Sequence, residues 1–271
     1  MTIGLIALDE NLASSIALRY ASFLANDISI QLQAVHVEKP DVNKYSASGT
    51  GWVRRTWERG VKDGAQQAIQ RFLNTEKVAV PFIGFPKVLI GDRDSVILKE
   101  IRKSGYDIFI EGSLNTSDNR EFFRLISSRL YTRAPCPIMV VKNLVSSNTV
   151  ALLCGDGANY KDLIHQAITI LKCDHISFDL IFYRYKESEC EISTEKKEAG
   201  NVLFEAEKLL EAAGIQPINT QVLTGTPEGA AQLLEKYRLV VSSFPSKTCP
   251  RLKVLAHCPS PVLLCKHDTR K

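Results

Sequence analysis

The sequence predicts an α/β protein of two tandem, doubly wound parallel-sheet domains with five strands each. Two observations predict it: short apolar runs alternate with longer helix-like stretches, and this order of elements occurs twice. The apolar runs show little alternation between apolar and polar residues, as expected for strands that helices cover on both faces. The length of 271 residues fits two domains of ordinary size.

The repeat is visible as three matching segments. Val88-Leu-Ile-Gly91 matches Val222-Leu-Thr-Gly225, 134 residues later, and each is followed by a helix-like stretch. Residues 134–142 match residues 258–266, 124 residues later, and residues 30–36 match 176–182 at an offset of 146. The falling offset indicates that the second copy lacks about ten residues before its last strand. We therefore expect domains at residues 1–143 and 149–271, joined by a short polar segment.

The elements of the first copy follow from its apolar runs and glycine or proline breaks. We expect strands at 3–8, 30–37, 77–90, 107–111 and 137–141, and helices at 11–25, 53–74, 94–104 and 121–132. The second copy is expected to repeat this order from about residue 149 to 265.

Composition excludes several classes of protein. The formal net charge of +4 comes from scattered Lys and Arg, without the basic run that nucleic-acid binding requires. No apolar run approaches membrane-spanning length, and the apolar start meets Asp9 too early for a signal-peptide core. We expect a cytoplasmic protein that binds neither nucleic acid nor membrane.

The seven cysteines form an odd set without CxxC pairs, which suits reduced thiols. Cysteines and histidines crowd the C-terminus, but they lack the close ligand pairs of common zinc modules, so we expect no metal site. Cys154, at the end of an expected strand, is the best candidate for a redox-sensitive thiol, but an inert buried thiol is the interpretation that we favour.

Ligands of open parallel sheets bind beyond the carboxyl ends of the strands. In the first copy these ends carry Asp9, His36-Val37, Gly91-Asp92 and Glu111-Gly112-Ser113. The carboxylate of Asp9 can accept a hydrogen bond from a ribose hydroxyl or an adenine amine. No GxSxG, Walker A or HExxH sequence is present, so we expect no enzyme and no catalytic residues.

These strand ends, together with Asp107-Ile-Phe-Ile-Glu-Gly-Ser113 and Ala134-Pro-Cys-Pro-Ile-Met-Val-Val141, resemble the universal stress protein family over nearly all of residues 1–143. The resemblance implies an adenine nucleotide α-hydrolase-like fold. It also implies a loop of the form G-x2-G-x9-G-(S/T) after the fourth strand, which holds the phosphates in members that bind ATP. The residues it assigns to an adenine nucleotide are Asp9, Val37, Gly112, Ser113, Asn115 and Ser127.

The loop departs from the family pattern in both copies. Asn115 replaces the second glycine, and the third falls at Arg124 or Leu125, where a bulky side chain obstructs close backbone approach. In the second copy Ser243 stands where Gly112 stood, and the missing residues remove the loop. Either Cys154 or Asp156 could match Asp9. We expect no nucleotide in the second copy.

The predicted function is that of a tandem, non-enzymatic stress-response module that requires no cofactor and binds adenine nucleotides weakly or not at all. The alternative is an ATP- or AMP-binding protein with its site, and at most slow hydrolysis, in the first copy. The resemblance implies that the fifth strands, 137–141 and 261–265, pair about a pseudo-two-fold axis to form a pseudo-dimer. The expected partner is another protein or a second copy of this chain.

Overall fold

A computed structural model describes residues 1–39, 51–114, 118–155, 157–171, 173, 175–195 and 199–267, with only the backbone of 51–55 and 57. The N-terminal half, residues 1–143, contains ten of its elements. They are β1 (Thr2–Ala7), α1 (Leu12–Ala25), β2 (Ile30–Glu38), α2 (Gly51–Glu76), β3 (Lys87–Ile90), α3 (Arg93–Ser104), β4 (Ile108–Gly112), α4 (Asn119–Ile126), α5 (Arg129–Arg133) and β5 (Ile138–Val141).

The C-terminal half, residues 149–271, repeats the alternation of strands and helices. Its elements are β6 (Thr149–Gly155), α6 (Tyr160–Leu171), β7 (Ser177–Tyr185), β8 (Glu191–Ser193), α7 (Asn201–Ala212), β9 (Asn219–Gly225), α8 (Pro227–Leu234), β10 (Leu239–Ser243), α9 (Pro250–His257) and β11 (Val262–Cys265).

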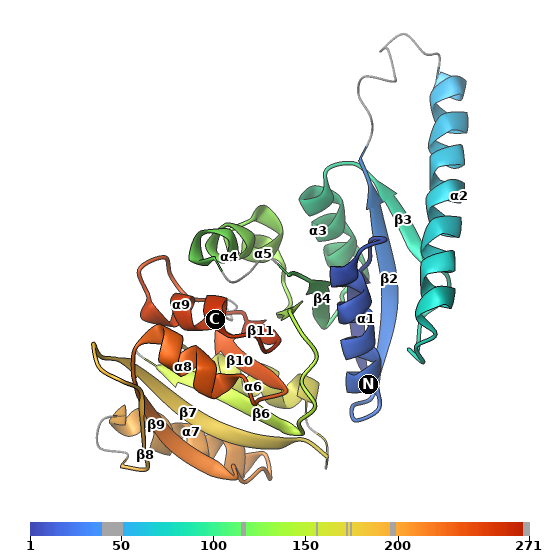
Figure 1. Ribbon diagram of the computed structural model, residues 1–271. Helices are drawn as coiled ribbons and strands as arrows, with labels where there is room; N and C mark the ends of the chain where they lie inside the picture. The colour runs from blue at the N-terminus through green and yellow to red at the C-terminus, as the bar shows by residue number, and fades with distance from the viewer. Residues whose placement is uncertain are drawn as a thin grey trace.

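The described strands form one eleven-stranded sheet in the order β3-β2-β1-β4-β5-β11-β10-β6-β7-β9-β8 (Figure 1). Neighbouring strands are parallel except at β5–β11 and β8–β9. The α/β class and the predominantly parallel sheet are confirmed. The expectation of five strands per copy is wrong for the C-terminal half, because the short strand β8 adds to its outer edge.

The two halves meet where β5 pairs with β11, as the family resemblance implied. The register is symmetric about Met139 and Leu263, with Ile138 opposite Leu264 and Val140 opposite Val262. Each strand occupies the sheet edge that its partner would otherwise leave exposed. The five strands of the N-terminal half and the six of the C-terminal half are therefore joined into a continuous sheet by backbone hydrogen bonds.

The sheet register supports the repeat offsets. Val35 lies opposite Lys87, and their counterparts 146 and 134 residues later, Ile181 and Gln221, also lie opposite each other. The same register matches Asp9 with Gly155, because Ala7 and Leu153 pair with Val35 and Ile181. Neither of the two residues considered from the sequence, Cys154 and Asp156, is the counterpart.

Two expected elements are shorter than the sequence suggested. The strand expected at 77–90 is confined to β3, with one isolated bridge between Phe82 and Leu32. Pro81 and Pro86 cannot donate to a ladder, and Gly84 has a φ of 66°, so the chain turns before β3 begins. The helix expected at 121–132 is interrupted at Ser127, and Ser128 starts a new helix by capping the amide of Tyr131.

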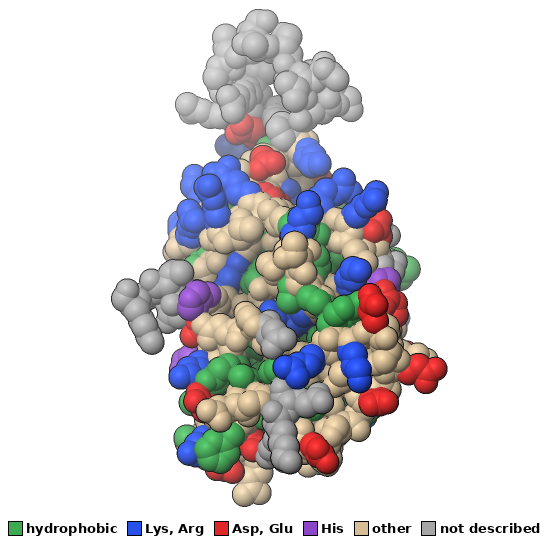
Figure 2. Space-filling model, turned by 90° about the vertical axis from the view of Figure 1, so that its left-hand side faces the viewer, with side chains coloured by type: hydrophobic (Ala, Val, Ile, Leu, Met, Phe, Trp, Pro, Cys, Tyr) green, Lys and Arg blue, Asp and Glu red, His purple; other side chains and the backbone are tan. Residues whose placement is uncertain are grey.

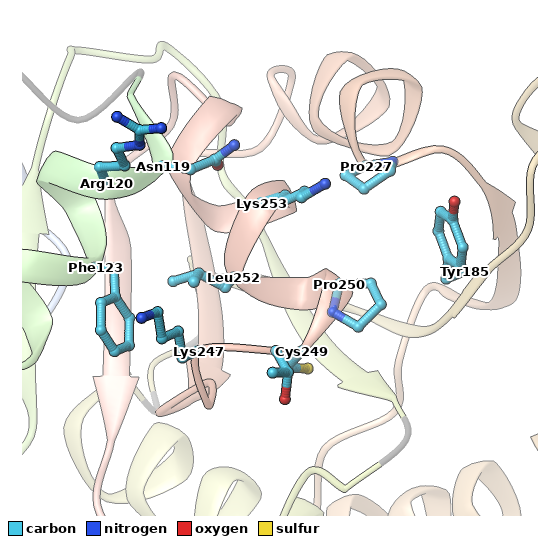
Figure 3. Close-up of a pocket in the computed structure, with 11 residues that line it drawn as sticks. Asn119, Arg120, Phe123, Tyr185, Pro227, Lys247, Cys249, Pro250, Leu252 and Lys253 are labelled. Carbon is cyan, nitrogen blue, oxygen red and sulfur yellow. The ribbon is translucent and has the colours of Figure 1, made fainter.

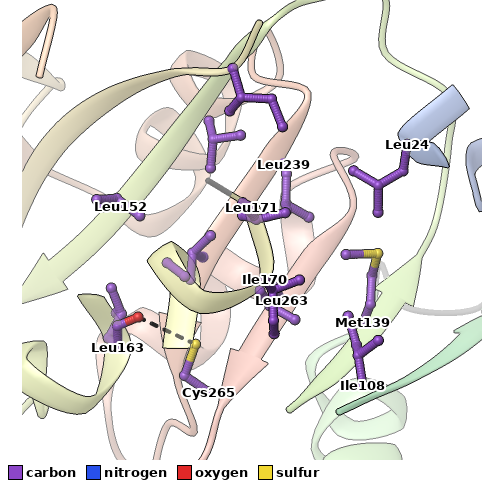
Figure 4. Packing of buried hydrophobic residues seen from close by; sticks show 14 of the residues in the cluster. Leu24, Ile108, Met139, Leu152, Leu163, Ile170, Leu171, Leu239, Leu263 and Cys265 are labelled. Carbon is purple, nitrogen blue, oxygen red and sulfur yellow. Dashed lines mark hydrogen bonds between the residues drawn. The ribbon is translucent and has the colours of Figure 1, made fainter. Parts of the chain in front are cut away.

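Apolar cores cover both faces of the sheet and continue across the seam between the halves. One core includes Leu24 of α1, Met139 of β5, Leu263 of β11 and Leu163 of α6, and Figure 4 shows it extending from the N-terminal to the C-terminal half. On the opposite face, α3, α4, α5, α8 and α9 supply the second core. This burial by helices on both faces explains why the strands read as apolar runs.

Arg238 links the halves through a buried polar contact. Its side chain is 1% exposed and forms an ion pair with Asp27, just after α1. The guanidinium donates to the carbonyl of Phe23 at 2.9 Å and stacks over the Phe23 ring at 4.1 Å. A polar interaction across the seam therefore accompanies the apolar packing.

Candidate functional site

The residues singled out in the N-terminal half gather at the carboxyl ends of three neighbouring strands. β1 lies between β2 and β4, so Asp9, Val37, Gly112 and Ser113 share one edge of the sheet. Asn115 lies outside the described residues. Ser127 is exposed and ends α4. The edge lies at the point where the strand order reverses, the usual ligand position in open α/β sheets.

The Asp9 carboxylate is paired with a histidine. Nδ1 of His36 lies 2.9 Å from Oδ1 of Asp9 and 2.8 Å from the carbonyl oxygen of Leu8, while Nε2 lies 3.2 Å from Oε1 of Glu38. The hydrogen bond with Asp9 raises the pKa of His36 to about 9, and the same bond lowers the pKa of Asp9. A ligand hydroxyl would have to share a carboxylate that His36 already holds.

A second charged group lies buried beside Gly112. Glu111 is 4% exposed, accepts a 2.5 Å hydrogen bond from Arg93 at the start of α3, and accepts another from the hydroxyl of Tyr131. Burial raises the pKa of Tyr131, so its hydroxyl stays a donor. Sequence reasoning missed Arg93 and Tyr131. The one available signal was a glutamate in the apolar run Asp107-Ile-Phe-Ile-Glu111.

Gly112 is covered by the first turn of α1. A Cβ atom at this position would lie 1.9 Å from the carbonyl oxygen of Ala13 and 2.4 Å from its carbon. Both atoms belong to the backbone, so a side chain could be accommodated only by moving the helix. The packing of α1 against β4 thus requires glycine here, independently of any ligand.

The segment that would form the phosphate loop is helical over Asn119–Ile126. Arg124 and Leu125, the positions where glycine was expected, lie inside α4. At the start of α5 the amide of Tyr131 donates to Ser128, and the amide of Leu130 donates to Oδ2 of Asp94 at 3.3 Å. A carboxylate of the chain itself therefore occupies an amide that could otherwise bind an anion.

The corresponding edge of the C-terminal half is occupied by Arg251 of α9. This residue is 3% exposed and donates to Oγ of Ser243, the counterpart of Gly112, at 3.2 Å. Its Nη1 lies 3.9 Å from where a Cβ on Gly155 would stand. A side chain thus lies between the ends of β6 and β10, where a ligand would enter.

Cys154 does not have the environment of a redox-sensitive thiol. It is fully buried, and burial raises its pKa to about 12. A thiol that holds its proton and is closed to solvent is inert, so the redox candidate is wrong and the alternative holds. All seven cysteines are free. Among the described residues, no three His, Cys, Asp or Glu side chains form a group that could hold a metal ion.

A pocket of about 640 Å³ lies between the halves, with α4 on one side and the segment leading into α9 on the other (Figure 3). Its lining includes the cations Arg120, Lys247 and Lys253 and the aromatic side chains Phe123 and Tyr185. No sequence motif indicates this pocket, because its lining comes from separate segments around residues 119–123, 185, 227 and 247–253. None of the helices in the described ranges is both long and apolar enough to cross a membrane.

Comparison with known proteins gives a consistent assignment. Residues 4–142 match the model of the universal stress protein family. A universal stress protein from Archaeoglobus fulgidus DSM 4304 is 15% identical, with 99% of this chain and 97% of that chain covered and a TM-score of 0.63. A putative universal stress protein from Pseudomonas aeruginosa UCBPP-PA14 is 14% identical. The match covers 98% of this chain and 92% of that chain, with a TM-score of 0.53.

A universal stress protein family protein from Arabidopsis thaliana, crystallised with AMP bound, is 16% identical. The match covers 55% of this chain and 95% of that one, with a TM-score of 0.31. No protein of curated function matches the sequence. The likeness to solved structures extends over both halves, and the family match spans residues 4–142, more than half of the chain. The chain therefore belongs to the universal stress protein family.

Proposed function

We propose that this chain is a non-enzymatic regulatory protein of the stress response that acts by contacting another protein or a second copy of itself. Adenine nucleotides bind it weakly or not at all. Two observations support the proposal: a helix replaces the expected third glycine, and a carboxylate of the chain holds an amide just after that helix. Helix α4 runs through positions 124 and 125, and the Asp94 carboxylate accepts from the amide of Leu130.

The energetic consequence of this arrangement is a penalty on phosphate binding. A phosphate that took the place of Asp94 would break a hydrogen bond to a charged group, at a cost of about 1.5–3 kcal/mol. That cost corresponds to a loss of roughly 10- to 150-fold in affinity. The Glu111 carboxylate beside Gly112 opposes a second anion, and Arg93, which could offset it, is already paired with Glu111.

Calorimetric titration with ATP and with AMP tests the nucleotide part of the proposal. We expect no saturable binding below roughly 100 μM, about −5.5 kcal/mol on the standard affinity scale. Asp9→Ala should behave like the wild type, as should the control Asp63→Ala, which removes an exposed carboxylate from α2. Micromolar binding that Asp9→Ala abolishes and Asp63→Ala preserves would overturn the proposal.

The regulatory part is tested in cells that lack the protein. If nucleotide binding is not the working activity, Asp9→Ala should restore stress survival as fully as the wild type does. A requirement for Asp9 in this assay, with a correctly folded variant, would instead favour the nucleotide-binding alternative.

That alternative, binding of ATP or AMP in the N-terminal half, is favoured by one feature of the same edge. The Asp9 side chain is 46% exposed, and the Arg93 side chain, 33% exposed, lies close enough to lower the pKa of Asp9. A sugar hydroxyl and a phosphate could therefore still find partners here. The titration above separates the two functions.

A further inference from the structure

The pocket between the halves has the chemistry of an anion site. Arg120 of α4, Lys247 before α9 and Lys253 within α9 line it, and none of its lining residues is acidic. In the described part of the chain these three side chains form no ion pair with a carboxylate. Figure 2 shows Lys and Arg side chains gathered on the face that contains these segments. An anion entering the pocket would thus meet three cations that no carboxylate of the described residues holds in an ion pair.

A fourth positive charge lies beneath the pocket. Arg251 lines a small recess of about 40 Å³ that shares Tyr185, Cys249 and Pro250 with the pocket. Its guanidinium is 3% exposed and donates to the neutral hydroxyl of Ser243. The recess therefore places an arginine next to the lining of the pocket.

The remaining wall of the pocket is aromatic and apolar. Phe123 of α4 lies on one side, with Nζ of Lys247 5.8 Å from its ring centre, and Tyr185 lies on the opposite side (Figure 3). Tyr185 is 46% exposed, and its hydroxyl donates to the Glu187 carboxylate at 3.2 Å, which leaves its ring open to the pocket. The volume of about 640 Å³ falls within the range of small-molecule sites.

We propose that this pocket binds a small organic anion that carries a planar ring, of the class of aromatic phosphates. The ring lies against Phe123, and the anionic group lies among Arg120, Lys247 and Lys253. Side-chain cations here take the role that backbone amides of a glycine loop play elsewhere. This inference is independent of the proposed function, which concerns the edge that contains Asp9.

Such a ligand would contact both halves of the chain at once. Arg120 and Phe123 belong to the N-terminal half, whereas Lys247 and Lys253 belong to the C-terminal half. Binding therefore stabilises the arrangement in which α4 lies against α9, and a ligand of this kind would signal by fixing the two halves together.

Fluorescence titration with 1-naphthyl phosphate tests the proposal on the full chain. We expect saturable binding that weakens at least tenfold in the double variant Lys247→Glu/Lys253→Glu. The control Lys208→Glu/Lys236→Glu makes the same charge change at exposed lysines outside the pocket lining and should bind like the wild type. Inorganic phosphate, which lacks the ring, and 1-naphthol, which lacks the charge, should each bind at least tenfold more weakly.

Cysteine alkylation locates the bound probe. Cys249 lines the pocket, whereas Cys173 and Cys190 are also half-buried but lie outside it. Saturating 1-naphthyl phosphate should slow iodoacetamide modification of Cys249, read by mass spectrometry, and leave Cys190 unchanged. Absence of saturable binding at millimolar probe, equal binding by the two double variants, or binding lost in Asp9→Ala would each overturn the proposal.

Discussion

The ammonium nitrogen of Lys142 lies 3.1 Å from the carbonyl oxygen of Cys258, so a lysine that follows β5 caps α9 of the other half. It also donates to the carbonyls of Leu255 and Ala256. Lys266, its counterpart after β11, donates to the carbonyl of Tyr131 in α5. Each half therefore supplies a cation to carbonyl groups near the C-terminal end of a helix in the other half. Positive charge is stabilising at that end of a helix.

Lys142→Met should cost more stability at high pH than at neutral pH. Burial lowers the pKa of Lys142 to about 8, from 10.5. Between these values the unfolded chain holds a proton that the folded chain has released, so the wild type gains stability as pH rises through this window. We expect the difference in unfolding free energy between wild type and variant to grow by about 1.4 kcal/mol from pH 7 to 9.

Urea unfolding at both pH values measures that difference. The contributions of the titratable groups that wild type and variant share cancel in it. Lys236→Met, at an exposed position, is the matched control and should change the unfolding free energy by less than about 0.5 kcal/mol at either pH. A Lys142→Met penalty that is the same at pH 7 and pH 9 would show that the folded lysine keeps its ordinary pKa.

The pair between Arg238 and Asp27 should respond differently to the loss of each partner. Asp27→Asn leaves the buried guanidinium without its counter-charge, and we expect a loss of about 2–4 kcal/mol, reduced from a fully buried pair because Asp27 is 21% exposed. Arg238→Met removes the buried charge and keeps most of the packing against Phe23, so it should cost less. Equal losses in the two variants, measured by urea unfolding, would contradict this reasoning.

The pair between His36 and Asp9 should make stability fall as pH rises from about 6.5 to 9. The folded pKa of His36 is raised to about 9, so the folded chain binds more protons than the unfolded chain in this window. Because Asp9 is 46% exposed, we expect a contribution of only about 1–2 kcal/mol. Asp9→Asn should lower the His36 midpoint in an NMR titration towards 6.5 and flatten the fall in stability relative to the wild type.

A His36 midpoint that does not change in Asp9→Asn would show that Asp9 is not its principal partner. The comparison must be made between variant and wild type, because the buried lysines act with the opposite sign above pH 8. Asp63→Asn, an exposed change on α2, should leave the midpoint of His36 where it is in the wild type.

The fold was predictable because it depends on pattern. Most strand positions and the offsets between copies follow from apolar runs, glycine turns and one repeat, whereas the pairing of 137–141 with 261–265 was implied by the family resemblance. The pattern could not predict the positions of single polar side chains. Glu111 and Arg93 are 18 residues apart, and nothing local shows that they meet. The same holds for Arg251, whose position between β6 and β10 depends on a helix packing rather than on a motif.

The predicted boundaries of two elements were wrong for a different reason. The expected strand at 77–90 and helix at 121–132 each contained residues of the right apolarity, but Pro81, Pro86 and the serine pair at 127–128 decided the local backbone. Backbone hydrogen bonding therefore overrode hydrophobic pattern at these places. Strand β8 was missed because three residues at a sheet edge carry almost no periodic signal.

Gly112→Ala should destabilise the protein even though no ligand is involved. Its Cβ would lie 1.9 Å from the carbonyl oxygen of Ala13, so α1 must move away from β4, and overpacking of this kind costs about 1–3 kcal/mol. Gly64→Ala is the control: it lies inside α2 with no atom within 4 Å of the added Cβ, and alanine there should stabilise by about 0.5–1 kcal/mol. Changes of opposite sign in the unfolding free energy of the two variants, measured with urea, would show that packing requires Gly112. No change in the unfolding free energy of Gly112→Ala would contradict this and leave ligand binding as the reason for the glycine.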